Sequence, residues 1–318
     1  MPEPLHRDLR SADSHEDLSD RAAAAVAGAA PLLRAIAAAR PSCVVAGPGL
    51  GRSGATIDAV ALALCALHPD RAGTDVEASL VLPGCPPGHS VRYCAAGPAL
   101  VLDADALWIL ARCPAVASGN RRCVVTPNVA EAARLWAAVR PGAPDGTEER
   151  EGAVEAARPG DPALPAAGPA LALSRALGGV TVVVKGADDV IGGPAAGADG
   201  SAGTPPAGPR DTPDEGDGGG QGATVRGAGS PRRCGGQGDL LAGTLGTFAS
   251  WAPHGGSLVP SAAAACCVVR EAAALAFGDK RRSMVTPDLL DRLGPAFETV
   301  FPDSLGVSPE RSEPARCD

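Results

Sequence analysis

The chain has 318 residues, of which 45% are hydrophobic and 20% are charged, so it can bury a full core as one large or two small domains. Its formal net charge of -8 and the lack of a long Lys/Arg block argue against a nucleic-acid-binding surface. The polar, acidic start carries no apolar signal region, and no apolar run is long enough to predict a membrane span. We therefore expect a soluble protein that is not secreted.

The ten cysteines lack C-x-x-C spacing, and most of them lie within apolar runs. This pattern favours buried thiols in a reducing compartment over a disulfide framework. The five histidines are scattered, and no cysteine-histidine cluster has the spacing of a structural zinc site.

In chain order, several segments repeat a short apolar strand, a small polar loop and an amphipathic helix. We expect strands over residues 43–46, 100–102, 123–125 and 180–184, and helices over 56–67, 107–110, 129–139 and from about 240 to Pro253. Uniformly apolar strands that alternate with helices indicate an α/β fold with a mainly parallel sheet covered on both faces. Ligands of such sheets bind beyond the carboxyl ends of the strands.

Two segments interrupt this pattern. Residues 141–169 are rich in Pro, Gly, Ala and acids, which predicts a long loop or a frayed helix. Residues 192–222 contain no Val, Ile, Leu, Met or aromatic residue, so we interpret them as a disordered insertion. The insertion would join two short strands near residues 189–191 and 224–226, and the tail after Ser304 is also expected to be mobile.

A glycine-rich loop runs into an apolar helix over residues 229–248, GSPRRCGGQGDLLAGTLGTF. Gly235, Gly236 and Gly238 can take positive φ, and a helix opening near Leu240 would present unpaired N–H groups to an anion. Asp239 falls in the first turn, where Asp commonly serves only as a helix cap. Its neighbours Gln237, Arg232 and Arg233, together with the glycines, favour a phosphate site with a built-in base. Further along the helix, Gly243 and Gly246 are expected to allow close approach of another element.

Polar residues also follow the other predicted strands. Residues 47–52, GPGLGR, form a turn that is weak evidence by itself. Asn128 and Glu131 lie one helical turn apart, so Glu131 is either a surface charge that complements the helix dipole or a ligand of Mg²⁺ through water. Asp103 and Asp105 are competing metal ligands. The sequence leaves open how many of these carboxylates face one site.

Lys185 follows a strand and is one of only two lysines, the other being Lys280. A snorkelling surface lysine is the ordinary alternative, but the position at a strand end favours phosphate contact.

In order, the motifs VVAGPGLGR, LVLDADALWIL, VVTPNVAEAARL, TVVVKGADDVI and SPRRCGGQGDLLAGTLG resemble the ATP-dependent NAD(P)H-hydrate dehydratases. This resemblance covers about residues 43–301 and implies a three-layer α/β/α ribokinase-like fold. Members of that family dehydrate the hydrated forms of NADH and NADPH, consume ATP and use a divalent metal ion, here Mg²⁺.

The resemblance also implies roles for individual residues. The hydrated nicotinamide nucleotide would contact Gly49, Asn128, Val129, Ala130, Glu131, Ala132, Ala133, Arg134 and Asp239. ATP would contact Lys185, Gly186, Ala187, Asp188, Asp189, Gly229, Ser230, Pro231, Arg232, Arg233, Cys234, Gly235, Gly236, Gln237 and Gly238. Asp239 would be the catalytic base, and Glu131 would hold the metal through water.

Three departures from the family pattern accompany this resemblance. Ala106 replaces the glycine of DADG, the 192–222 insertion lengthens a hairpin beside the ATP site, and the family's amino-terminal strand and helix are absent. We therefore expect residues 1–40 to be a partly helical amino-terminal remnant of a truncated chain, 41–304 the dehydratase domain and 305–318 a flexible tail.

Two other functions remain open from the sequence. One is a small-molecule kinase of the ribokinase superfamily, and the other is an inactive remnant or binding module. We expect a cytoplasmic location, although mitochondrial or plastid targeting and homo-oligomerisation are left open.

Overall fold

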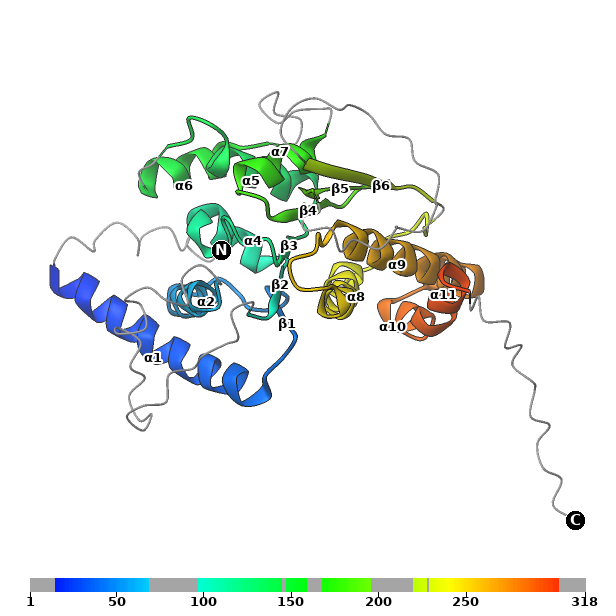
Figure 1. Cartoon of the computed structure of the whole chain (residues 1–318), viewed down its shortest axis with the longest axis horizontal. Helices are drawn as coiled ribbons and strands as arrows, with labels where there is room; N and C mark the ends of the chain where they lie inside the picture. Colours follow the sequence, from blue (N-terminus) through cyan, green and yellow to red (C-terminus); the bar gives the residue numbers. More distant parts are fainter. Residues whose placement is uncertain are drawn as a thin grey trace, which may run out of the picture.

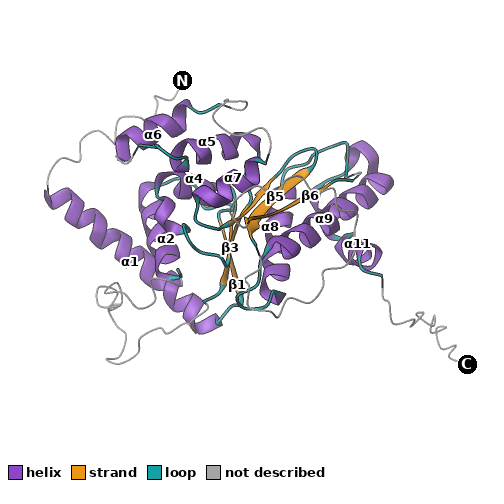
Figure 2. Cartoon of the chain, turned by 45° about the horizontal axis from the view of Figure 1, so that its top comes forward, coloured by secondary structure: helices purple, strands orange, loops and turns teal. Residues whose placement is uncertain are grey.

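The computed structural model describes residues 15–68, 97–144, 147–158, 168–195, 220–227 and 229–302. These residues form a six-stranded sheet in the order β1-β2-β3-β4-β5-β6, with helices on both faces (Figures 1 and 2). The strands are β1 (Cys43–Ala46), β2 (Ala99–Leu102), β3 (Cys123–Val125), β4 (Thr181–Val184), β5 (Asp189–Pro194) and β6 (Gly220–Val225).

Strands β1 to β4 are parallel, whereas β4, β5 and β6 pair antiparallel. In the register of the parallel part, Val45 lies opposite Val101 and Val101 lies opposite Val124. The carboxyl ends of four consecutive strands therefore meet at one edge of the sheet. This arrangement confirms the predicted α/β class with a mainly parallel sheet.

One group of helices covers the first face of the sheet. It comprises α1 (His15–Ala39), α2 (Gly54–Ala66), α4 (Asp105–Arg112), α5 (Val129–Val139), α6 (Thr147–Ala156) and α7 (Pro169–Ala176). A second group, α8 (Gln237–Trp251), α9 (Val259–Lys280), α10 (Thr286–Leu290) and α11 (Leu293–Val300), lies on the opposite side (Figure 1). Short 3-10 helices span Pro114–Val116 and Arg281–Ser283.

Alternate residues of the strands supply two separate hydrophobic cores, as the period of a β-strand requires. Leu100, Leu102 and Val125 pack with the first group of helices. Val101 and Val124 pack with α8 and α9 on the other face. Because both of their faces are covered, the central strands β2 and β3 are apolar along their whole length.

Several elements match their predicted bounds, including β1, β3 and α5. Other boundaries were wrong. Helix α8 begins at Gln237 instead of near residue 240, α4 spans Asp105–Arg112 instead of 107–110, and the hairpin strands extend to Pro194 and from Gly220. Helix α6 lies within the segment 141–169, where a frayed helix was one of the two predicted alternatives. The hairpin is longer because backbone pairing and packing on α7 hold residues with no large apolar side chain, such as Gly192 and Gly220. The rest of the predicted insertion lies outside the described residues, as does the predicted tail.

Two described helices are long and apolar enough to cross a membrane by length and composition, Asp20–Ala39 and Val259–Ser283. The expectation that no apolar run reaches this length was therefore wrong for the described residues. Half of the second span is buried inside the protein, where α9 packs against α8, β5 and β6. The first span is 17% buried and packs on α2.

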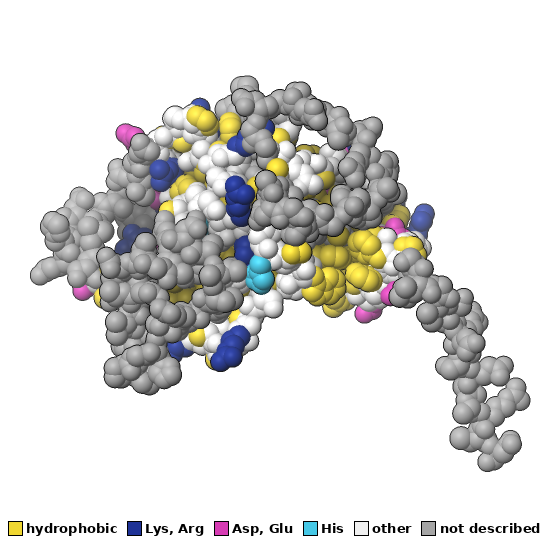
Figure 3. All heavy atoms as spheres, viewed as in Figure 1, with side chains coloured by type: hydrophobic (Ala, Val, Ile, Leu, Met, Phe, Trp, Pro, Cys, Tyr) yellow, Lys and Arg dark blue, Asp and Glu magenta, His cyan; other side chains and the backbone are white. Residues whose placement is uncertain are grey.

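Aromatic side chains of α8 and α11 gather beside the sheet. Phe248 contacts Trp251, Phe297 and Phe301, with ring centroids 5.3 to 6.1 Å apart. Trp251 is 64% exposed, and hydrophobic side chains are visible over these carboxyl-terminal helices in Figure 3.

Candidate active site

Side chains from three neighbouring strand ends meet in one buried cluster. Asp103 follows β2, Thr126 follows β3 and Lys185 follows β4. The Lys185 ammonium lies 2.6 Å from Asp103 Oδ1, and the Thr126 hydroxyl donates to the same oxygen at 2.7 Å. A methyl group added at Gly238, in the first turn of α8, would lie 3.4 Å from Asp103 Oδ2 and 3.5 Å from Lys185 Nζ. The start of α8 therefore lies against the side chains at the strand ends.

The two carboxylates of the DADA motif point to different partners. Ala104 between them has a positive φ of 48°, which separates their side chains. Asp103 is committed to Lys185 and Thr126, whereas Asp105 accepts a hydrogen bond from the Gly51 amide and pairs with Arg52, both at 3.0 Å. Neither matches the hypothesis of a free metal ligand.

Asn128 and Glu131 form a reciprocal cap at the start of α5. The Asn128 side chain accepts from the amides of Ala130 and Glu131, and one Glu131 carboxylate oxygen accepts from the Asn128 amide at 2.8 Å. Helix capping thus occupies one oxygen of Glu131. This role is close to the first of the two predicted alternatives, a charge that complements the helix dipole. Among the described residues, no group of three or more His, Cys, Asp and Glu side chains could hold a metal.

The two segments predicted to bind ATP lie side by side. The Gly186 carbonyl, in the turn between β4 and β5, accepts from Arg233 of the glycine loop at 3.0 Å. The same carbonyl accepts from Arg270 of α9 at 3.3 Å. Asp189 accepts from the Gly186 amide at 3.2 Å and from Arg270 Nε at 2.7 Å, so this predicted ATP contact already serves to hold the turn.

Arg270 is a site residue that the sequence reasoning missed, because its partners are 43 to 84 positions away in the chain. Burial opposes its charge, but the hydrogen bond and negative charge of Asp189 outweigh that effect, so the pKa of Arg270 is raised. The available signal was Arg270 itself, which together with Glu271 interrupts a long apolar stretch of α9. Such a residue needs a buried partner.

The glycine loop reaches α8 through one left-handed residue. Gly236 has φ +89°, whereas Gly235 and Gly238 have no positive φ, which corrects the prediction for these two. Thr286 of α10 packs over Gly236 and donates to the Gly235 carbonyl. Thr286 is a second residue that the sequence did not indicate.

Asp239 lies in the first turn of α8 and is exposed. Within the described part of the chain, no hydrogen bond or ion pair engages its carboxylate. Its unengaged carboxylate distinguishes Asp239 from Asp103, Asp105 and Asp189.

The remaining predicted residues divide by exposure. Exposed ones are Val129, Arg134, Ala187, Asp188, Pro231, Arg232, Arg233 and Gly235. Gly49 has φ +70° and open space where a side chain would project. Ala132 and Ala133 are buried, at 0% and 4% exposure, so their side chains pack in the interior and do not face a ligand.

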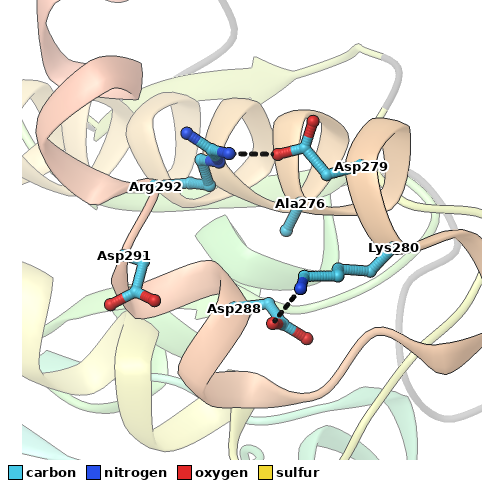
Figure 4. A pocket seen from close by; sticks show the side chains of 6 residues that line it. All are labelled: Ala276, Asp279, Lys280, Asp288, Asp291 and Arg292. Atoms are coloured by element: carbon cyan, nitrogen blue, oxygen red, sulfur yellow. Dashed lines mark ion pairs between the residues drawn. The ribbon is translucent and has the colours of Figure 1, made fainter.

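A pocket of about 320 Å³ lies apart from the strand ends, between α9 and α10 (Figure 4). It is lined by Ala276, Asp279, Lys280, Asp288, Asp291 and Arg292. Lys280 lies 3.9 Å from Asp288, and Arg292 pairs with Asp279. Internal ion pairs thus compensate most of its charges, and the second lysine of the chain ties α9 to α10.

The mainly parallel sheet, its two helical layers and the glycine-rich helix start at the strand ends define an α/β protein, and this arrangement is consistent with a ribokinase-like fold. No protein-family model matches the chain. Relatives named ATP-dependent (S)-NAD(P)H-hydrate dehydratase do match it, from Bos taurus at 35% identity and from Ixodes scapularis at 32%. The alignments cover 82% and 78% of this chain. The chain belongs to the ATP-dependent (S)-NAD(P)H-hydrate dehydratase family.

The chain spans only part of these relatives. It covers 61% of the Bos taurus protein and 71% of the Ixodes scapularis protein. A Homo sapiens relative of the same name is 35% identical over 210 residues. The aligned part makes up 48% of the length of that relative.

Proposed function

We propose that the protein uses ATP to dehydrate the (S)-hydrates of NADH and NADPH and so restores the normal cofactors. The observation that carries this proposal is the approach of Lys185 to the amino-terminal turn of α8, which also carries the unengaged Asp239. An anion cradle and an available base are what a phosphoryl transfer to a hydroxyl requires.

In the proposed reaction, the hydroxyl oxygen of the hydrated nicotinamide ring attacks the γ-phosphorus of ATP, and Asp239 accepts the proton of that hydroxyl. The bond from that phosphorus to the bridging oxygen breaks, and ADP leaves. The N–H groups at the start of α8 and the Lys185 ammonium stabilise the charge on the transferring group. The ring C–O bond then breaks, phosphate departs, and loss of a proton from the adjacent carbon restores the double bond.

We further propose that the residues implied by the family bind the two nucleotides, with the hydrate near Gly49 and residues 128–134 and ATP near residues 185–189 and 229–238. The described side chains do not form a cage for a resident metal, so a hydrated Mg²⁺ would arrive bound to ATP. Glu131 would accept a hydrogen bond from metal-bound water through the oxygen that the helix cap leaves free. When bound, Mg²⁺ would neutralise phosphate charge.

The domain assignment is also part of this proposal. Residues 41–304 would be the dehydratase domain, and residues 1–40 a partly helical amino-terminal segment. We propose a cytoplasmic protein with a small-molecule substrate and no membrane or nucleic-acid partner. The described cysteines form no disulfide, which supports this location.

The test is recovery of NADH absorbance when the full chain is incubated with ATP, Mg²⁺ and hydrated NADH. Asp239→Asn should lower turnover by about 100-fold or more, since general-base catalysis contributes at least that much, while ATP affinity changes little. Asp279→Asn is the matched control, because its carboxylate lies in the pocket of Figure 4 and should leave turnover intact.

Three outcomes would contradict the proposal. A wild-type chain that binds ATP without restoring NADH would overturn the dehydratase function. A stable phosphorylated product would indicate a kinase instead. Full activity of Asp239→Asn would reject Asp239 as the base.

A further inference from the structure

Asp103 is a fully buried carboxylate at the proposed phosphate site. It is 1% exposed, and one of its oxygens receives both the Lys185 ammonium at 2.6 Å and the Thr126 hydroxyl at 2.7 Å. Its second oxygen faces the start of α8, where a methyl group on Gly238 would contact it at 3.4 Å. A buried carboxylate beside an anion site would repel the anion unless its charge is compensated.

The position of the Lys185 ammonium depends on the Asp103 carboxylate. A lysine ammonium is a compact charge on a flexible stem, and its position is fixed only by the groups that it contacts. Its side chain is 20% exposed, and it starts from a backbone held by the Pro127 carbonyl at 2.8 Å. Of the three N–H donors of the ammonium, one contact to Asp103 leaves the others for a phosphate oxygen.

We propose that Asp103 is a positioning residue that holds the Lys185 ammonium against the phosphates at the start of α8. Thr126 orients the Asp103 carboxylate, and Lys185 compensates its charge so that an anion can bind nearby. This inference rests on the proposed function, because it assumes that Lys185 contacts ATP.

The two members of the pair have different expected effects. Lys185→Met removes a phosphate contact and leaves the Asp103 charge uncompensated, so affinity for a non-hydrolysable ATP analogue should fall by about 10- to 100-fold. Asp103→Asn keeps the shape and releases the ammonium. We expect turnover to fall by about tenfold while analogue affinity changes by less than about threefold, because lost orientation and lost repulsion oppose each other.

The decisive measurement is the affinity of the double variant for the analogue compared with that of Lys185→Met. Asp103→Asn in the Lys185→Met background removes the uncompensated charge, so the double variant should bind the analogue more tightly than Lys185→Met alone. Thr126→Val should lower turnover by less than Asp103→Asn does, because it removes only the hydroxyl that orients Asp103 and keeps the ion pair of Asp103 with Lys185. Asp58→Asn is the control, since this carboxylate pairs with Arg21 on the surface of α2.

Calorimetric titration of the full chain with the analogue, thermal unfolding and steady-state kinetics together test the inference. Additive losses of affinity in the double variant would overturn it. So would folded variants with unchanged affinity and turnover and only a lower Tm, which is the behaviour of a purely structural pair.

The binding measurement separates this inference from the proposed function. If the wild-type chain binds the analogue but restores no NADH, the function fails, while rescue of affinity in the double variant still supports the pair. A wild-type chain that binds no nucleotide would overturn both.

Discussion

Arg270 connects three segments through one guanidinium group. It pairs with Asp189, donates to the carbonyls of Gly186 and Gly227, and lies beside Gly229 at the entrance of the glycine loop. The Asp189 and Arg270 side chains are only 10% and 15% exposed. A single side chain of α9 therefore fixes the relative positions of the proposed ATP-binding segments.

At this scale we predict that Arg270→Ala lowers the free energy of unfolding by about 3 to 5 kcal/mol, because it leaves the Asp189 charge buried without its partner. Arg21→Ala is the matched control. Its Arg–Asp pair with Asp58 has the same chemistry, but Arg21 is 55% exposed, so its loss should be at most about 1 kcal/mol. Chemical denaturation of both variants provides the measurement, and equal losses would contradict the argument from burial.

Helix α8 depends on one glycine for its packing. A methyl group at Gly246 would lie 2.9 Å from Val45 Cγ2 of β1, whereas nothing lies within 4 Å of the same position on Gly243. The expectation of close approach is therefore confirmed for Gly246 and wrong for Gly243. The sequence could not distinguish them, because both lie in an amphipathic helix and only the docked partner decides which side is crowded.

This difference between two glycines of one helix gives a prediction at the level of the element. Gly246→Ala should destabilise the protein by about 1 to 3 kcal/mol, since β-branched Val45 cannot move its methyl group freely. Gly243→Ala should instead stabilise it by up to about 1 kcal/mol through helix propensity. Thermal unfolding of the two variants tests these opposite changes in stability. A shift of Tm in the same direction for both variants would refute the prediction.

Buried thiols contribute to the pH dependence of the whole molecule. Burial raises the pKa of Cys43 from 9.0 to about 11, and burial also raises the pKa values of Cys123 and Cys266. A raised pKa favours the protonated form in the folded state. The resulting stability is present below pH 9 and is lost as pH rises toward 11.

We therefore predict a loss of unfolding free energy between pH 8 and pH 10, to which Cys43 contributes about 1 kcal/mol. Cys43→Ala should reduce the loss by about that amount, measured by denaturant titration at both pH values. An identical pH dependence in wild type and Cys43→Ala would contradict the prediction.

Much of the molecule could be predicted from periodicity and local chemistry. Apolar runs gave the bounds of β1 and β3, and Asn128 marked the start of α5 because its side chain caps that helix. Long-range partners could not be predicted in the same way. Asp103 pairs with Lys185, 82 positions away, and Asp189 pairs with Arg270, 81 positions away. No pattern in the neighbouring residues predicts either pairing.

The contact between Val45 and Gly246 also bears on the order of folding. These residues lie about 200 positions apart in the chain, although neighbouring strands of the sheet follow one another in sequence. The strands can pair progressively with short or moderate loop closures, but α8 must return across the whole sheet to reach β1 and β2. We therefore expect the proposed ATP-binding site to form late in folding, because the start of α8 reaches the strand ends only when the first and last parts of the domain have come together.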